Sequence, residues 1–87
     1  MRTAEQITEI LVYWGSFDRG NDGWTERVTY DDGHQESGEA THDVNSIEDL
    51  YESVVATAHA HGLEINGDSV AIDRDEGGFG IWTRPEV

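Results

Sequence analysis

The residues with the clearest capacity for chemistry are four histidines. A histidine can bind a metal ion or transfer a proton near neutral pH. His59 and His61 are two positions apart in a stretch with helical periodicity, so their side chains point to different faces and cannot hold one ion. His34 falls in an expected turn and His42 in an expected strand. Their spacing therefore predicts no metal site and no catalytic histidine.

Two glycine-bearing segments, 18–26 and 73–80, are rich in carboxylates. An EF-hand calcium loop that began at Asp18 would need an oxygen ligand where Gly20 stands and a glutamate where Thr29 stands. We expect a turn there, with weak cation binding as the alternative. The second segment lacks both the lysine of a Walker loop and the glycine spacing of a dinucleotide-binding loop, so we expect its carboxylates to be solvated.

The chain contains no cysteine, which rules out a thiolate nucleophile and a disulfide and favours an intracellular location. No pair of nucleophile and base can be assembled from the other motifs. We therefore predict that the protein is not an enzyme and has no catalytic, metal-binding or cofactor-binding residues.

The strongest compositional feature is negative charge: 19 Asp and Glu stand against five Arg, with a formal net charge of −14. A surface that binds nucleic acid needs clustered positive charge to displace the counterions of phosphates. The composition thus excludes direct nucleic-acid binding and favours a partner protein with a basic surface. The 87 residues allow one domain, 1–87, and no apolar run has the length of a membrane helix. We expect a cytoplasmic protein that does not bind membranes.

Apolar periodicity predicts two helices. In segment 3–17, where Thr3 and Gln6 fit a capping box, the helical spacing is carried by Ile7, Ile10, Leu11 and Trp14. The second helix, 46–61, has Ser46 as its N-cap. Gly62 suits the left-handed residue that ends a helix, and Leu63 suits the apolar contact after it.

Strands are expected at 24–30, 37–44, 69–73 and 79–84, with a hairpin turn at Asp31, Asp32 and Gly33 and a loop at 16–23. The order α-β-β-α-β-β predicts an α+β fold with a four-stranded antiparallel sheet and two helices on one face. The two halves align as an αββ repeat, or they resemble each other only because two capped amphipathic helices look alike. The expected core is Ile7, Ile10, Leu11, Trp14, Val28, Tyr30, Leu50, Val54, Leu63, Val70, Ile72, Phe79 and Ile81.

Alternation through Phe79 and Ile81 predicts that Trp82 lies on the helix-free face of the sheet, which Arg27 shares. An exposed aromatic residue among acids is typical of a protein interface. The alternative is that Trp82 packs on a neighbouring strand or stacks on Arg27. The predicted protein-binding residues are Trp82, Arg27, Asp31, Asp32, Glu36, Glu39, Asp43, Asp73, Asp75 and Glu76.

Two functions fit these features. The first is a small non-catalytic protein that binds another protein, as an inhibitor or as a mimic of nucleic acid, because alternate strand residues lie about 6.6 Å apart, close to two phosphate steps. In size and charge the chain resembles small phage anti-defence proteins of the anti-CRISPR type, which implies an inhibitor of a basic protein. The alternative is a small protein of a salt-loving archaeon whose acidity is salt adaptation and whose interaction role is unknown. A homodimer is compatible with both.

Overall fold

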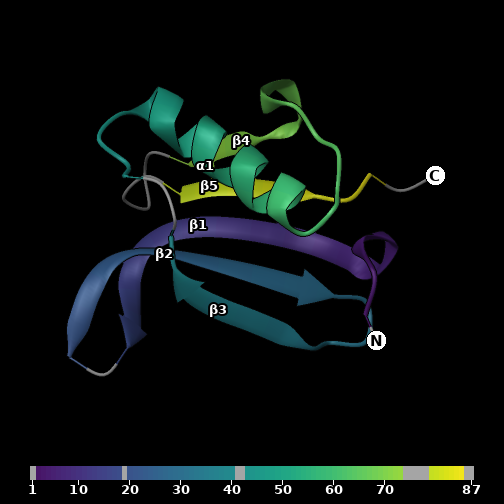
Figure 1. Ribbon diagram of the computed structural model, residues 1–87. Helices are drawn as coiled ribbons and strands as arrows, with labels where there is room; N and C mark the ends of the chain where they lie inside the picture. The colour runs from purple at the N-terminus through teal and green to yellow at the C-terminus, as the bar shows by residue number, and fades with distance from the viewer. Residues whose placement is uncertain (1, 19, 41–42, 74–78, 86–87) are drawn as a thin grey trace.

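The computed structural model describes residues 2–18, 20–40, 43–73 and 79–85. One helix packs on a five-stranded antiparallel sheet with the strand order β3-β2-β1-β5-β4 (Figure 1). The elements are η1 (Ala4–Gln6), β1 (Ile7–Asp18), β2 (Asn21–Tyr30), β3 (Gln35–Glu39), α1 (Ile47–Ala60), η2 (Gly67–Ser69), β4 (Ala71–Asp73) and β5 (Phe79–Thr83). The α+β class is confirmed, whereas the prediction of four strands with two helices in the order α-β-β-α-β-β is wrong.

The first predicted helix is a strand. Only the short 3-10 turn η1 precedes it, in which the backbone N–H of Thr3 donates to the side-chain oxygen of Gln6 at 3.0 Å. The pairing of β1 with β2 shifts by one residue between Ile7 and Glu9. This bulge turns Ile7 to the same face as Ile10, so a spacing of three residues, which resembles a helix, arises inside a strand.

The bulge explains the error, and the rest of β1 carries a strand signal. The run Ile10 to Trp14 is apolar throughout and contains β-branched and aromatic side chains, as expected for a central strand that pairs with a strand on each side. Because β1 takes the place of a helix, the predicted αββ repeat is also wrong. The expected loop 16–23 is the end of the hairpin formed by β1 and β2 instead.

The turn at Asp31, Asp32 and Gly33 is confirmed and joins β2 to β3. Gly33 has a φ of 87°, and its backbone N–H donates to the carbonyl oxygen of Tyr30 at 3.0 Å. The return strand is shorter than predicted, because β3 ends at Glu39. His42 and its neighbour 41 lie outside the described residues.

The second predicted helix is confirmed as α1, with both of its ends. The Ser46 hydroxyl accepts from the backbone N–H of Asp49 at 3.2 Å. At the other end Gly62 has a φ of 82°, and its backbone N–H donates to the carbonyl oxygen of His59. The backbone N–H of Leu63 donates to the carbonyl oxygen of Ala58. This pair of hydrogen bonds is a Schellman motif. Among the described helices, none is long and apolar enough to cross a membrane.

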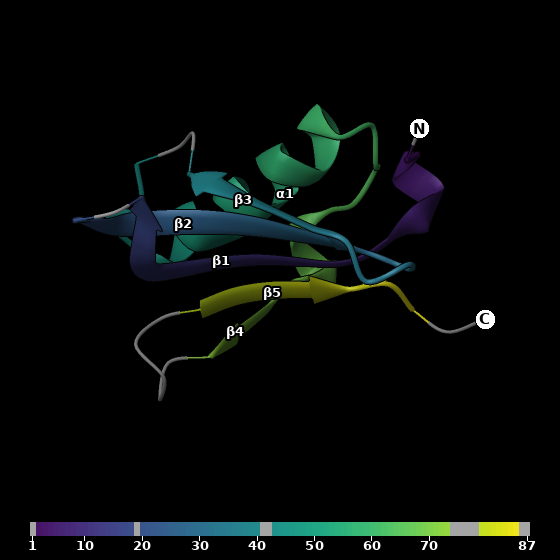
Figure 2. The same cartoon turned by 90° about the horizontal axis from the view of Figure 1, so that it is seen from below.

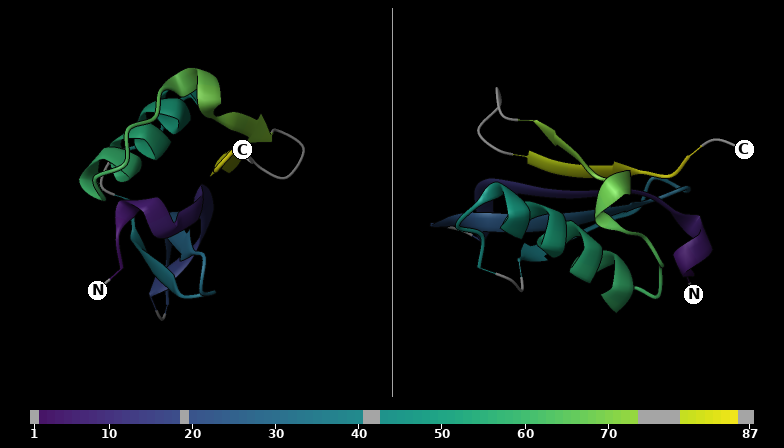
Figure 3. Two further views of the ribbon diagram at one scale, coloured as in Figure 1. Left: turned by 90° about the vertical axis from the view of Figure 1, so that its right-hand side faces the viewer. Right: turned by 90° about the horizontal axis from the view of Figure 1, so that it is seen from above.

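The helix lies across one face of the sheet, above β1 and β5 (Figure 3). It comes closest at Gly80 of β5, where an added Cβ would lie 2.9 Å from Cγ2 of Val54. A glycine is therefore needed there to let helix and strand approach. The buried core between the two layers consists of Ile7, Ile10, Val12, Val28, Tyr30, Val44, Leu50, Val54, Ala58, Val70 and Trp82.

The expected core is thus confirmed in part. Leu63 and Ile72 are half-buried and pack against it. Leu11, Phe79 and Ile81 are half-buried on the opposite face of the sheet instead. Trp14 was expected in the core, yet 57% of it is exposed, and its ring packs edge to face on that of its neighbour Trp24.

Candidate functional site

The predicted position of Trp82 on the helix-free face is wrong. Trp82 pairs with Ile10, a core residue, and directly opposed residues of antiparallel strands share a face. Only 3% of Trp82 is exposed, and the Arg84 guanidinium stands 5.7 Å from its ring centroid. Gly80, its neighbour on the same face, lies directly under α1. Trp82 is therefore part of the core beneath the helix and has no surface to offer a partner.

Arg27 lies on the face away from the helix, as predicted, because it pairs with Leu11 of β1. Figure 2 views the strands from below, with α1 behind them. Arg27 is half-buried, forms an ion pair with Glu9 at 3.4 Å and stands 5.9 Å from the ring centroid of Tyr13. Tyr13 in turn packs edge to face on Phe79 at 6.2 Å. These side chains contact one another within the sheet, and among the described residues this face presents no exposed large apolar side chain.

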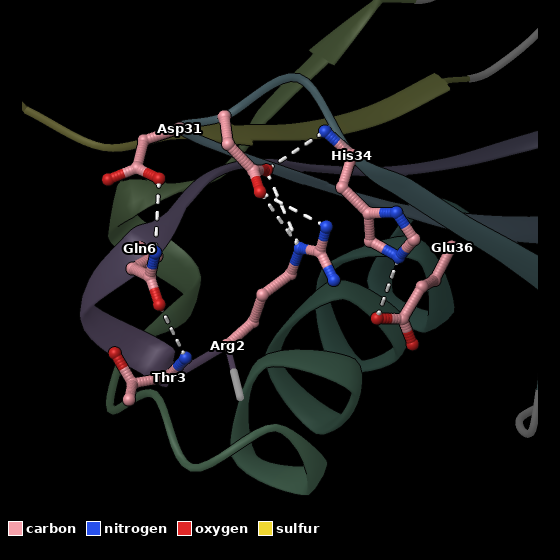
Figure 4. A network of polar contacts seen from close by, with 7 residues as sticks. Arg2, Thr3, Gln6, Asp31, His34 and Glu36 are labelled. Atoms are coloured by element: carbon pink, nitrogen blue, oxygen red, sulfur yellow. Dashed lines mark hydrogen bonds and ion pairs between the residues drawn. The ribbon is translucent and has the colours of Figure 1, made fainter.

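The acidic turn after β2 is also held by contacts within the chain (Figure 4). The Asp32 carboxylate forms an ion pair with Arg2 at 3.1 Å and accepts from the backbone N–H of His34 at 3.0 Å. Asp31 accepts from the Gln6 amide at 3.3 Å. Glu36, on β3, lies 3.4 Å from the ring of His34. Part of the charge predicted to face a partner therefore ties the N-terminal turn to the hairpin.

This network changes two titrations. The hydrogen bond from the His34 backbone, followed by the hydrogen bond from Arg2, holds the pKa of Asp32 below its ordinary value. Burial raises the pKa of Tyr30, and the Glu36 carboxylate acts in the same direction. Neither group lies in a cleft that could use the shift for acid–base chemistry.

The predicted acidic residues do not gather at one place. Asp31 follows Tyr30, which pairs with Ile7 of β1. Asp73 pairs with Phe79, which lies beside Tyr13 of β1. Six residues of β1 separate Ile7 from Tyr13, a distance of about 20 Å. Asp31 and Asp73 therefore lie far apart along the sheet. Asp75 and Glu76 lie outside the described residues.

The best-formed surface site is a cleft at the end of the sheet where β1 turns into β2. Trp14 and Trp24 form its aromatic wall, with ring centroids 5.7 Å apart and planes at 84°. Trp14 is the one exposed large apolar side chain among the residues that the structure describes. The cleft has a volume of about 360 Å³. This is at the lower end of the range for ligand sites in proteins.

Carboxylates and the segment before α1 complete this cleft. Glu39, at the end of β3, and Asp43 are exposed residues that line it, and Asp22 lines it from β2. Val44 is buried beneath and anchors the segment to the core. In the described part of the chain, no three His, Asp or Glu side chains are placed to hold a metal ion. The arrangement is an aromatic corner with an acidic rim.

The sequence analysis named Glu39 and Asp43 but missed the two tryptophans that give them a context. Trp24 was read as a residue of the sheet and Trp14 as part of a helical core stripe. The two tryptophans could have been found from the segments that precede Gly15 and follow Gly23. If these segments form the two strands of a hairpin, Trp14 lies opposite Trp24 near its end, which is the pairing observed.

Comparison with protein-family models, curated proteins and solved structures gives no match for this chain.

Proposed function

We propose that this protein is a small, acidic, non-catalytic protein that acts by binding a partner protein with a basic surface. The observation that carries the proposal is the 57% exposure of Trp14 on the wall of a cleft with Asp43 at its rim. Large aromatic side chains that remain exposed in a folded domain are enriched at protein interfaces and often act as their energetic centre.

The charge supports a basic partner. The net charge is −14, and the described arginines are engaged within the chain: Arg2 and Arg27 in ion pairs, and Arg84 in hydrogen bonds to the carbonyls of Ile7 and Ala4. The field around the domain therefore attracts basic proteins and speeds their association.

A second candidate, salt adaptation, is favoured by the spread of the exposed carboxylates. They occur on nearly every element and loop rather than on one face, at Glu5, Asp22, Asp31, Asp32, Glu36, Glu39, Asp43, Glu48, Glu52, Glu64, Asp68 and Asp73. A mimic of nucleic acid would concentrate its charge along one surface, so this spread argues against mimicry. The overall acidity then serves solubility in concentrated salt, and binding is confined to the cleft.

Photo-crosslinking to a defined basic protein tests the proposal. Benzoylphenylalanine is placed at position 14, or at position 52 on the exposed side of α1 as a control, and each variant is irradiated with protamine at 0.15 M salt. We expect adducts from position 14 and few from position 52. Equal yields from both positions would mean that protamine binds through diffuse charge alone, which leaves salt adaptation as the better account.

A further inference from the structure

Arginines of this chain repeatedly stand over aromatic rings. In the described residues the distances from the guanidinium carbon to the ring centroid are 5.8 Å for Arg2 and Tyr30, 5.9 Å for Arg27 and Tyr13, and 5.7 Å for Arg84 and Trp82. No described arginine stands over Trp14 or Trp24. In this part of the chain, the tryptophan pair is thus an aromatic surface to which no cation is bound.

The geometry of the pair suits a cation. The two indole planes meet at 84°, so a group placed in the angle between them faces both π systems. The face of an aromatic ring is its negative pole, and tryptophan attracts cations most strongly among the aromatic side chains. An exposed corner of this kind can hold one cationic head group.

The rim supplies the opposite charge. Asp43 is exposed and, among the described residues, forms no ion pair. Glu39 is opposed by Thr25, so its side chain lies on the other face of the sheet. The residues present make no metal site. An organic cation therefore fits the cleft better than a metal ion does.

We infer that the cleft receives an arginine side chain of a basic partner protein, with the guanidinium against the Trp14 and Trp24 rings and its N–H groups directed to the Asp43 carboxylate. This inference rests on the proposed function and names the group that the cleft recognises. Guanidinium fits better than ammonium, because it is planar, stacks on aromatic faces, sheds water more readily and presents a fork of donors to carboxylates.

The test uses three peptides that differ only in the type of one side chain, which occurs three times in each peptide. A decapeptide with three arginines is compared with the same peptide carrying lysine, and with one carrying citrulline, a neutral group of the same shape. Binding is followed by NMR through the indole N–H signals of Trp14, Trp24 and Trp82. We expect the arginine peptide to shift the signals of Trp14 and Trp24, and to leave that of Trp82, which is buried, unchanged.

A matched pair of variants separates the cleft from overall charge. Asp43→Asn removes the negative charge at the rim of the cleft, and the control Glu39→Gln removes one from the opposite face at the same end of the sheet. We expect the rim variant to weaken binding of the arginine peptide at least tenfold more than the control variant. Each measurement is repeated with Arg19→Ala, so that the chain's own guanidinium is not the occupant.

The outcomes distinguish the inference from the proposed function. Equal losses in the rim variant and the control variant, equal binding of the lysine peptide, or unchanged Trp14 and Trp24 signals would overturn the arginine site while leaving a basic partner possible. Equal binding of the citrulline peptide would show that charge is not recognised. Failure of every basic peptide to bind would overturn both the inference and the proposed function.

Discussion

At the scale of single residues, Trp14 and Trp82 both lie on the helix side of the sheet but have opposite surroundings. Trp82 is 3% exposed and stands against Ile10, whereas Trp14 is 57% exposed and touches Trp24. Trp82 therefore belongs to the core, and Trp14 is accessible at the surface. The distinction follows from where α1 covers the sheet, because the helix passes over Gly80 and does not reach the end of β1.

The first prediction concerns Trp82. Trp82→Ala should lower the free energy of unfolding by about 3–5 kcal/mol, because it empties a large volume of the core. Trp14→Ala removes the same side chain from an exposed position and should change it by less than about 1 kcal/mol. Urea unfolding followed by circular dichroism measures both, and a larger loss for Trp14→Ala would contradict the structure.

The second prediction concerns Asp32, whose pKa is lowered by the His34 backbone and Arg2. A lowered folded-state pKa stabilises the fold above the unfolded-state value of 3.8, and this contribution is lost as pH falls through the folded-state pKa. Asp32→Asn should therefore be less stable than the wild type near neutral pH and equal to it in strong acid. Urea midpoints from about pH 7 down to about pH 2 follow this, and a difference that does not change with pH would refute the assignment.

At the scale of elements, much of the fold could be predicted from local signals. The N-cap Ser46 and the terminator Gly62 fix α1, and the turn at Asp31 and Gly33 fixes the hairpin of β2 and β3. The first strand could not be identified from spacing, because the bulge after Ile7 produces a helical spacing inside a strand. The cleft could not be predicted either, since it depends on strand pairing and on the segment that leads into α1.

The third prediction tests how closely the helix is seated on the sheet. Gly80→Ala should lower the free energy of unfolding by about 1–3 kcal/mol, because its Cβ would lie 2.9 Å from Val54. Gly38 of β3 is a matched control, since an added Cβ there meets nothing within 4 Å. Gly38→Ala should be neutral or slightly stabilising. Equal stability of the two variants would mean that α1 does not approach β5 in this way.

At the scale of the whole molecule, the net charge of −14 acts on folding as well as on binding. Repulsion among like charges disfavours the compact state, and added salt screens it over about 10 Å at 0.1 M. The cleft adds to this general charge a specific aromatic contact. We therefore propose two roles for the negative charge: it produces a diffuse electrostatic field, and it forms a local acidic rim beside Trp14.

The fourth prediction follows from the diffuse field. The melting temperature should rise between about 0.05 M and about 1 M KCl, and equally in NaCl, because screening depends on ionic strength rather than on the cation. A melting temperature that stays flat or falls with salt would show that self-repulsion does not limit stability.

The most direct test of the central claim is the salt dependence of protamine binding by wild type and Trp14→Ala, measured by calorimetry. Trp14→Ala leaves the charge unchanged and removes the aromatic wall of the cleft. We predict two parallel lines of log Kd against log salt, with the variant at least tenfold weaker at every salt concentration. Two lines that coincide would contradict the account, because binding would then depend on diffuse charge and not on the cleft.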